Sequence, residues 1–294
     1  MQDYVKIKNF EEYTKKINDY ETQLKIICSN VRPYNVLIVS GDPGIGKSYR
    51  AEQILKTQTN VKFTKVEGSS VSPVQLYSLM WQHNDEIIVL DDVNSILQDG
   101  KDGASLLKAC TESKPVRLLQ WQKRNPNCIP VSKFKCDNNI KIAERMNDIV
   151  KNSERKHLIK AHDAGMTFPD MFYFTGAIII LTNKSLKSFD RVTEGAVSNR
   201  GCHMQIAFSV EGAVDFIKKF GPTLKTYGDA VYTDATLKDT IAFMTSPKAV
   251  KYYVENYKIP TIRNLGKIAG QYQLGVALDE SVLENNTEVQ YNAF

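Results

Sequence analysis

The sequence predicts an α/β protein with a mostly parallel sheet flanked by helices, followed by a smaller, all-helical C-terminal domain. Three observations support this fold class. Short apolar runs rich in β-branched residues alternate with segments of helical periodicity between residues 35 and 208. A glycine-rich loop directly follows the first apolar run. Beyond residue 208 the apolar runs stop, and helical segments separated by Gly, Ser and Pro take over.

These periodicities assign strands and helices in chain order. The expected strands lie at residues 35–39, 61–66, 86–90, 177–181 and 204–208. The expected helices lie at residues 10–27, 47–56, 74–81, 211–220, 237–245, 247–257 and 261–272. Because strands and helices alternate through the first part of the chain, we expect crossover connections and helices on both faces of the sheet.

The same assignment divides the chain into regions. Residues 1–30 form a lead-in helix, residues 31–208 the α/β core, residues 209–278 a helical lid, and residues 279–294 a polar tail that we expect to be frayed. An insert at about residues 97–175 interrupts the core between two strands and is far longer than a minimal connection. Loops of this length are usually functional or disordered.

Composition and charge indicate the broad class of protein to which the chain belongs. The chain has 42% hydrophobic residues and a net charge of +5, which is typical of a globular protein. No apolar run approaches the ~20 residues that span a bilayer, and the N-terminus is polar, so we expect no membrane partner and a cytoplasmic location. Five scattered cysteines are typical of reduced thiols. Zinc binding remains an alternative for Cys128, Cys136, His157 and His162, although the two cysteines are spaced more widely than in the usual structural zinc sites.

The glycine-rich loop matches the phosphate-binding pattern G-x-x-x-x-G-K-[ST] in full and lies between a strand and a helix, as that pattern requires. Its glycines let backbone N–H groups point at a phosphate, and the helix N-terminus adds a partial positive charge. Lys47 would reach the β- and γ-phosphates of ATP, and the Ser48 hydroxyl would ligate Mg²⁺. The predicted nucleotide-binding residues are Gly41, Asp42, Pro43, Gly44, Ile45, Gly46, Lys47 and Ser48.

Polar residues follow two later strands. The apolar run that starts at residue 87 ends in Asp91 and Asp92, at the carboxyl end of the sheet, where ligands of such folds bind. Asp91 is the candidate Mg²⁺ ligand, and Asp92 is the candidate group that orients or deprotonates the attacking water. Asn183 follows the strand at residues 177–181 and could reach the γ-phosphate or the same water. An Asn after a strand is otherwise a common turn residue.

The order of these motifs, followed by the segment AVSNRG at residues 196–201 before a last short strand, resembles the AAA+ ATPases over about residues 30–275. The resemblance implies that Asn183 is the sensor-one residue and that Arg200 is the arginine finger, which enters the site of a neighbouring subunit. It also implies that Arg263 is the sensor-two arginine at the start of a lid helix. Arg191 is the nearby alternative to Arg200. A finger that acts in the neighbour implies a homo-oligomer, a ring or helical assembly with a hexamer as the expected ring.

Two features depart from the usual AAA+ pattern. Asp92 stands where most members have Glu, and this Asp-Asp pair resembles replication initiators, helicase loaders and some viral helicases. The insert resembles that of ATPases encoded by phages and other mobile elements. It also resembles the superfamily-three viral helicases, which place a basic DNA-contacting hairpin between the same two motifs. A bacterial or phage-infected cytosol is therefore the expected location.

The insert concentrates positive charge. Residues 98–175 contain ten Lys and four Arg against six Asp and three Glu, an excess equal to that of the whole chain. Basic residues can track a phosphate backbone, and the interleaved aromatic residues can stack on bases. These aromatic residues, which could equally form the core of the insert, are Trp121, Phe134, Phe172 and Tyr173. The candidate nucleic-acid contacts are Arg117, Lys123, Arg124, Lys133 and Lys135.

Three functions from different classes fit this pattern. The favoured one is an oligomeric ATPase that remodels or moves on nucleic acid, as a helicase, a helicase loader or an accessory of packaging or replication. An ATP-dependent protein remodeller or chaperone is the first alternative, and the net basic insert argues against it. A P-loop phosphotransferase is the second alternative, which the set of Asn183, Arg200 and Arg263 disfavours.

Overall fold

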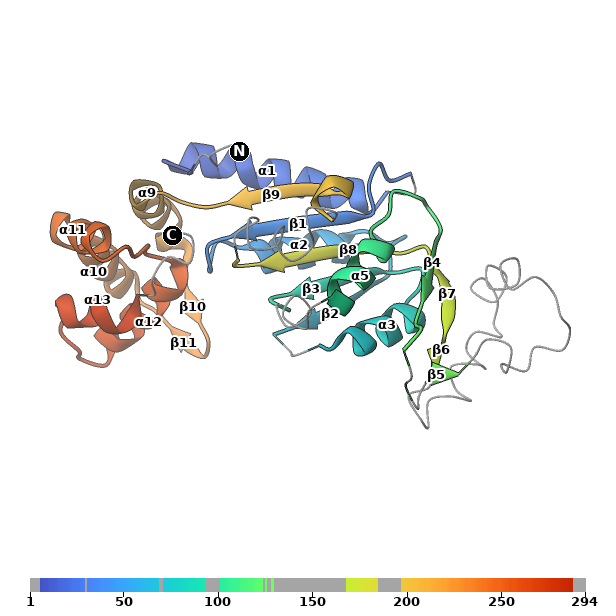
Figure 1. Cartoon of the computed structure of the whole chain (residues 1–294). Helices are drawn as coiled ribbons and strands as arrows, with labels where there is room; N and C mark the ends of the chain where they lie inside the picture. The colour runs from blue at the N-terminus through green and yellow to red at the C-terminus, as the bar shows by residue number, and fades with distance from the viewer. Residues whose placement is uncertain are drawn as a thin grey trace, which may run out of the picture.

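A five-stranded sheet forms the centre of the molecule (Figure 1). The computed structural model describes residues 6–29, 31–68, 71–93, 101–123, 125, 128–129, 168–184 and 197–287. The sheet has the order β2-β3-β8-β1-β9, and each neighbouring pair is parallel. Its strands are β1 (Val36–Gly41), β2 (Phe63–Glu67), β3 (Ile87–Asp91), β8 (Ala177–Thr182) and β9 (Cys202–Ile206). The predicted parallel sheet is confirmed, because all five strands lie where the apolar runs placed them, within a few residues.

Helices cover both faces of this sheet. Successive side chains of a strand point to opposite faces, so each buried strand supplies two cores. Leu37 and Val39 of β1 lie in the core under α1 (Phe10–Ile27) and α2 (Lys47–Thr57). Val36 and Ile38 lie in the opposite core, under α3 (Pro73–Gln82) and α5 (Lys101–Cys110). This two-sided burial explains why the central strands read as continuous apolar runs.

Local side-chain hydrogen bonds fix where several helices begin. Ser72 and Gln75 form a reciprocal capping box at α3, which carries a proline in its first turn. Thr261 and Asn264 form another at α12 (Ile262–Gln273). Such caps satisfy backbone N–H groups that have no partner within the helix, so these helix starts are encoded locally.

The C-terminal part of the chain has its own apolar core, which includes Ile217, Leu237 and Leu265. Its remaining helices are α9 (Val210–Phe220), α10 (Asp234–Met244), α11 (Pro247–Glu255) and α13 (Glu280–Asn286). A short antiparallel hairpin, β10 (Thr226–Tyr227) with β11 (Ala230–Val231), adds strand structure to the region that we expected to be all helical. In Figure 1 these orange and red elements lie beyond the carboxyl ends of the sheet strands.

The expectation of a frayed tail from residue 279 is wrong for residues 280–286, which form α13. Asp279 caps this helix, and Val282 and Leu283 are buried in the C-terminal core. Asn264 of α12 donates a hydrogen bond from Nδ2 to the Asn286 carbonyl. The segment is polar on average, but two adjacent apolar residues suffice to dock one short helix. Residues 288–294 lie outside the described residues.

Besides α5, the described parts of the insert include a ribbon of short strands at the amino end of the sheet, opposite the C-terminal helices (Figure 1). Its strands are β4 (Arg117–Gln120), antiparallel to β7 (Met171–Phe174), and β5 (Cys128–Ile129), paired with β6 (Phe168–Pro169). Phe172 is fully buried and packs edge-on against Tyr77 and Trp81 of α3. Trp121 also packs on Tyr77, with ring centroids 5.6 Å apart. These two aromatic residues therefore belong to a core.

Among the described residues, no helix is both long enough and apolar enough to cross a bilayer.

Candidate nucleotide-binding site

The phosphate-binding loop joins β1 to α2 and has the backbone that its glycines permit. Gly41 lies so close to β9 that a Cβ atom there would come within 2.0 Å of the Ile206 carbonyl oxygen. Gly46 precedes α2 with a left-handed φ of 89°. As a glycine it has no side chain to cap the helix, unlike Ser72 at α3 or Thr261 at α12. The first N–H groups of α2 are thus left for an anion.

Lys47 is buried at the start of α2, with 7% of its surface exposed. Its ammonium donates to the carbonyl oxygens of Gly41 and Asp42, both at 2.9 Å, and to Asn183 Oδ1 at 2.8 Å. Burial lowers the pKa of Lys47 to about 8, against the opposing effect of the carboxylates of Asp92, Asp42 and Asp91. An anion bound at the loop would favour the charged ammonium and draw it away from these carbonyl groups.

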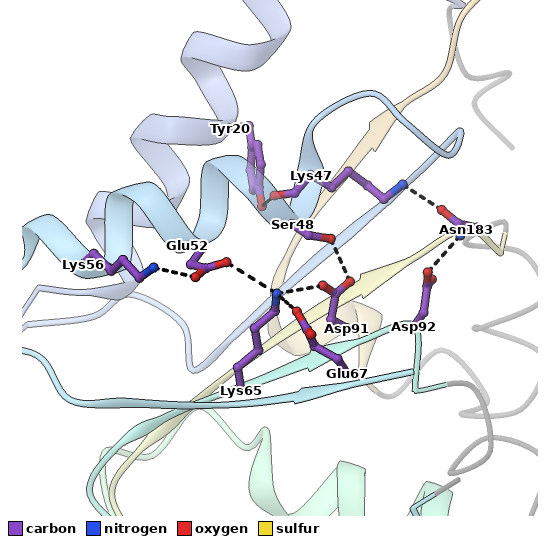
Figure 2. Close-up of polar contacts among 10 residues, drawn as sticks. All are labelled: Tyr20, Lys47, Ser48, Glu52, Lys56, Lys65, Glu67, Asp91, Asp92 and Asn183. Atoms are coloured by element: carbon purple, nitrogen blue, oxygen red, sulfur yellow. Dashed lines mark hydrogen bonds and ion pairs between the residues drawn. The ribbon is translucent and has the colours of Figure 1, made fainter. Parts of the chain in front are cut away.

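Ser48 and Asp91 meet at the carboxyl end of the sheet. The Ser48 hydroxyl donates to Asp91 Oδ1 at 2.9 Å, and Asp91 is the last residue of β3 (Figure 2). Asp91 Oδ2 lies 3.2 Å from the ammonium of Lys65, a residue of β2. Burial acts to lower the pKa of Lys65, but hydrogen bonds to Glu67 and Asp91 outweigh it, and the pKa is raised.

Asn183 connects Lys47 to Asp92. Its Oδ1 accepts from Lys47, and its Nδ2 donates to Asp92 Oδ2 at 3.1 Å (Figure 2). Asp92 has a left-handed φ of 55°, a conformation that non-glycine residues adopt rarely and that Asp tolerates better than most. Its other oxygen, Oδ1, is buried without a hydrogen-bond partner among the described residues. That atom is therefore available to a water molecule or a ligand.

Two tyrosines of α1 hold the backbone of the loop. The Tyr13 hydroxyl donates to the Ile45 carbonyl at 3.0 Å, and the Tyr20 hydroxyl donates to the Lys47 carbonyl at 2.9 Å. Both rings are buried, and Tyr13 also packs on Phe216 of α9, with ring centroids 4.5 Å apart. The lead-in helix thus fastens the loop to the C-terminal helices.

Arg263, for which the resemblance implies the sensor-two role, lies beside the loop. A Cβ atom added to Gly44 would come within 3.4 Å of Arg263 Cγ and within 3.3 Å of Thr261 Cβ. The charge of Arg263 also acts to lower the pKa of Lys47. The first turn of α12 therefore covers the tip of the phosphate-binding loop.

Arg200 lies at the other end of the sheet. It ends a short 3₁₀ helix (Ser198–Arg200) just before β9, whose first residue pairs with Leu37 near the start of β1. Five residues of strand span about 17 Å, so Arg200 cannot reach the loop at the end of β1 in its own chain. Its Nη1 donates to the Lys108 carbonyl at 2.6 Å, and 33% of the side chain is exposed. The alternative finger, Arg191, lies outside the described residues.

The assignment of Arg117 to nucleic-acid contact is wrong. Arg117 is 2% exposed, and its guanidinium donates to the carbonyl oxygens of Lys114, Pro115 and Gly176. It also stacks over Phe174, with Cζ 4.9 Å from the ring centroid. Burial lowers the pKa of Arg117 to about 10. This arginine ties the ribbon to the start of β8, and a polymer cannot reach it.

Among the other basic candidates, only Lys123 is described. Its side chain is 67% exposed and pairs with Asp102 of α5. Arg124, Lys133 and Lys135 lie outside the described residues, as do Phe134, Cys136, His157 and His162. Within the described part of the chain, no group of three or more His, Cys, Asp or Glu side chains is arranged to hold a metal ion. Cys128 is a free thiol there.

Sequence reasoning missed three residues of this site. Lys65 belongs to no recognised motif. Only the alternation of side chains along β2 could have placed it on the same face of the sheet as Asp91. Tyr13 was assigned to the apolar stripe of α1, and Tyr20 continues that stripe. The spacing identified their buried rings, but nothing in the spacing indicates that their hydroxyl groups hold the loop.

No protein-family model matches the chain. An uncharacterized 36.7 kDa protein in the nrdC-mobD intergenic region of Enterobacteria phage T4 is 26% identical over 119 residues. The match covers 38% of this chain and 36% of the phage protein, so this chain spans little more than a third of that relative.

Several solved structures are similar in fold. The RuvB Holliday junction branch migration motor of Thermotoga maritima is 10% identical, with a TM-score of 0.40 over 95% of this chain and 70% of that one. The ORC1 protein of Aeropyrum pernix, solved in complex with DNA, is 11% identical, with a TM-score of 0.45 over 92% of this chain and 63% of that one.

The chain's own features identify its fold. A complete phosphate-binding loop follows β1, two acidic residues end β3, and a polar residue follows β8 at the same end of a parallel sheet. A set of C-terminal helices packs against the loop through α12. These features give the chain a P-loop α/β fold that resembles the AAA+ type.

Proposed function

We propose that this protein is a Mg²⁺-dependent ATP hydrolase that works as a homo-oligomer on nucleic acid. The observation that carries the hydrolase proposal is the continuous set of contacts from Lys47 through Asn183 to Asp92, beside the Ser48–Asp91 pair. This set brings a cation, a hydroxyl–carboxylate pair and a second carboxylate to one uncapped helix N-terminus.

Lys47 and the N–H groups of the loop would bind the phosphates of ATP. The loop lies between β1 and the N-terminus of α2, where backbone donors and the helix dipole favour an anion. Lys47 gives a movable charge, because its three present acceptors are two backbone carbonyl groups and one amide oxygen, none of which is an anion. Arg263 adds a second cation on the other side of the loop.

The oxygen atoms around Ser48 fit a Mg²⁺ ion, which prefers hydroxyl, carboxylate and water ligands. Ser48 and Asp91 would hold it, and it would supply charge neutralisation at the phosphates. Asp92 Oδ1, which has no partner among the described residues, is the atom best placed to accept a hydrogen bond from the attacking water. Asn183 would keep Asp92 in that orientation.

Hydrolysis would also need Arg200 of a neighbouring subunit. Arg200 lies at the end of the sheet remote from its own loop, and a third of its side chain is exposed. A finger in that position can act only on another copy of the chain, which is the reason to propose a ring or helical assembly, with a hexamer as the expected ring.

The nucleic-acid part of the proposal rests on the net positive charge of the insert. With Arg117 assigned to the core, the remaining candidates are Lys123, Arg124, Lys133 and Lys135. A protein substrate is the competing possibility, since the packing of Phe172 and Trp121 in a core removes two of the residues that could stack on bases.

The decisive experiment measures the ATPase rate with single-stranded DNA, duplex DNA, RNA and no polymer. Stimulation by one polymer supports the full proposal, and replacing the four remaining basic candidates with Ala should then reduce binding and flatten its salt dependence. Hydrolysis without any stimulation would favour a protein substrate, and transfer of phosphate to a nucleoside would favour a phosphotransferase.

Lys47→Ala is the control for the site. It should abolish ATP binding or turnover, whereas Lys56→Ala, on the solvent side of the same helix, should leave both unchanged. Normal turnover in Lys47→Ala would remove the hydrolase proposal altogether.

A further inference from the structure

Lys65 is a partly buried cation beside the candidate metal ligand, and none of the motifs accounts for it. β2 and β3 are parallel neighbours in a register that sets Lys65 beside Val89 and Glu67 beside Asp91. Side chains two residues apart share a face, so Lys65, Glu67 and Asp91 all project to the side of the sheet covered by α2. Glu52 reaches the same place from α2 itself (Figure 2).

One ammonium group therefore forms ion pairs with three carboxylates. Lys65 Nζ lies 3.2 Å from Asp91 Oδ2 and 3.7 Å from Glu52 Oε2, and it also pairs with Glu67. Only 17% of the lysine side chain and 12% of the Asp91 side chain are exposed. Three N–H donors can meet three acceptors, and partial burial of both side chains reduces the screening of the Lys65–Asp91 pair by water.

The two oxygens of Asp91 have different partners. Ser48 donates to Oδ1 at 2.9 Å, and Lys65 pairs with Oδ2 at 3.2 Å. A carboxylate held at both oxygens cannot rotate freely, so Oδ1 stays directed toward the phosphate-binding loop. Without Lys65, Asp91 would lose one of these two partners and would lie beside the uncompensated charge of Glu67, its neighbour in the register.

We propose that Lys65 is a positioning residue for Asp91, which fixes this carboxylate for Mg²⁺ and keeps the carboxylates of Glu67 and Glu52 from competing with it. This inference rests on the proposed ATPase function and adds a residue to it. A cation so close to a metal site also repels the metal. We expect the ordering of Asp91 to outweigh this repulsion. Removing Lys65 should therefore weaken Mg²⁺ binding, which can be measured.

The test compares Lys65→Met with the parent protein, because Met keeps the length of the side chain and removes its charge. A fluorescent ATP analogue reports nucleotide binding in EDTA and then during a Mg²⁺ titration, and a thermal melt without nucleotide reports folding. We expect binding in EDTA to be unchanged and the Mg²⁺ concentration at half-maximal response to rise about five- to tenfold, as expected for loss of one hydrogen bond of ordinary strength.

Three further variants make the test specific. Lys65→Arg keeps the charge and the donors and should stay within about twofold of the parent. Lys65→Gln keeps N–H donors without charge and should fall between Lys65→Arg and Lys65→Met, which also covers the case in which Lys65→Met does not fold. Lys56→Met breaks only the ion pair of Lys56 with Glu52 and should leave the Mg²⁺ response unchanged.

Two results would overturn the inference. A Mg²⁺ midpoint that is unchanged in Lys65→Met, while the melting temperature falls, would make Lys65 a structural residue only. A midpoint that decreases would mean that its repulsion of the metal dominates. In both cases the parent still binds nucleotide, so the proposed function stands. A parent that binds no nucleotide in EDTA or Mg²⁺ would remove the proposed function and this inference together.

Discussion

Each end of the sheet holds a buried cation, and the surroundings of the two cations differ. Lys47, at the carboxyl end, donates to Gly41, Asp42 and Asn183, and carboxylates nearby counteract the lowering of its pKa by burial. Arg117, at the amino end, donates only to backbone carbonyl groups and lies over an aromatic ring.

The difference shows when a cation in this fold is free to bind a ligand. Lys47 stands at an uncapped helix N-terminus whose N–H groups need an anion, so a ligand can replace its present acceptors. Arg117 is enclosed on all sides by the chain, and removing it would leave buried carbonyl groups without donors. Positive charge in the sequence therefore indicates binding only where the fold leaves the charge accessible.

Arg200 tests this difference between the two ends of the sheet, because it lies at the amino end and we still expect it to act in catalysis. Arg200→Ala should bind ATP with near-normal affinity and hydrolyse it about 10³–10⁵-fold more slowly, since a finger acts on the charge of the transition state. Mixing Arg200→Ala with Lys47→Ala subunits should restore part of the activity, because some interfaces then combine an intact Lys47 with an intact Arg200. The measurement is the specific activity of mixtures against each parent variant.

The mixing result depends on proof that the two variants assemble together. Specific activity should also rise with protein concentration as the oligomer forms. Mixtures that co-assemble and yet remain as inactive as either variant would show that Arg200 does not act in a neighbour, and Arg191 would be tested next.

A substitution at Asp92 tests which carboxylate at the carboxyl end of the sheet activates the attacking water. Asp92→Asn keeps the Asn183 contact possible and removes the charge, so ATP should still bind while hydrolysis falls about 10²–10⁴-fold, the usual contribution of a general base. Nucleotide binding and single-turnover hydrolysis, measured separately, check this. Loss of binding as well would mean that Asp91 and Asp92 have each other's roles.

Arg117 tests the amino end. Arg117→Met should lower the free energy of unfolding by about 1–3 kcal/mol, because three carbonyl groups lose their donor. Urea unfolding would measure the loss, and Lys123→Met, a change at an exposed side chain, is the matched control. Below its melting temperature the Arg117 variant should bind polymer as the parent does. A polymer affinity that falls without any loss of stability would restore Arg117 as a contact.

Tyr20 gives the smallest expected effect. Tyr20→Phe keeps the buried ring and removes only the hydroxyl that donates to the Lys47 carbonyl. We expect a loss of about 0.5–1.5 kcal/mol in the free energy of unfolding and an increase of a few-fold in the KM for ATP, with kcat nearly unchanged. A KM equal to that of the parent, at lowered stability, would limit Tyr20 to a role in folding.

Much of the fold could be predicted because its determinants are local. The strands of the central sheet are buried on both faces, so their apolar runs are continuous and easy to place. The helix at residues 280–286 was missed because only Val282 and Leu283 signal its buried side, and a pair of apolar residues has no periodicity.

The sequence by itself determined the phosphate-binding loop and the side of the sheet on which its partners gather. A contiguous motif carries its own backbone geometry, and parallel strands necessarily bring their carboxyl ends together. Tertiary structure alone decided which charged residues are available. Arg117 donates a hydrogen bond to the carbonyl oxygen of Gly176, 59 residues away. Lys65 contacts Asp91 only because β2 and β3 are neighbours in the sheet. Whether a charge is free depends on contacts between residues far apart in the chain, and composition does not record those contacts.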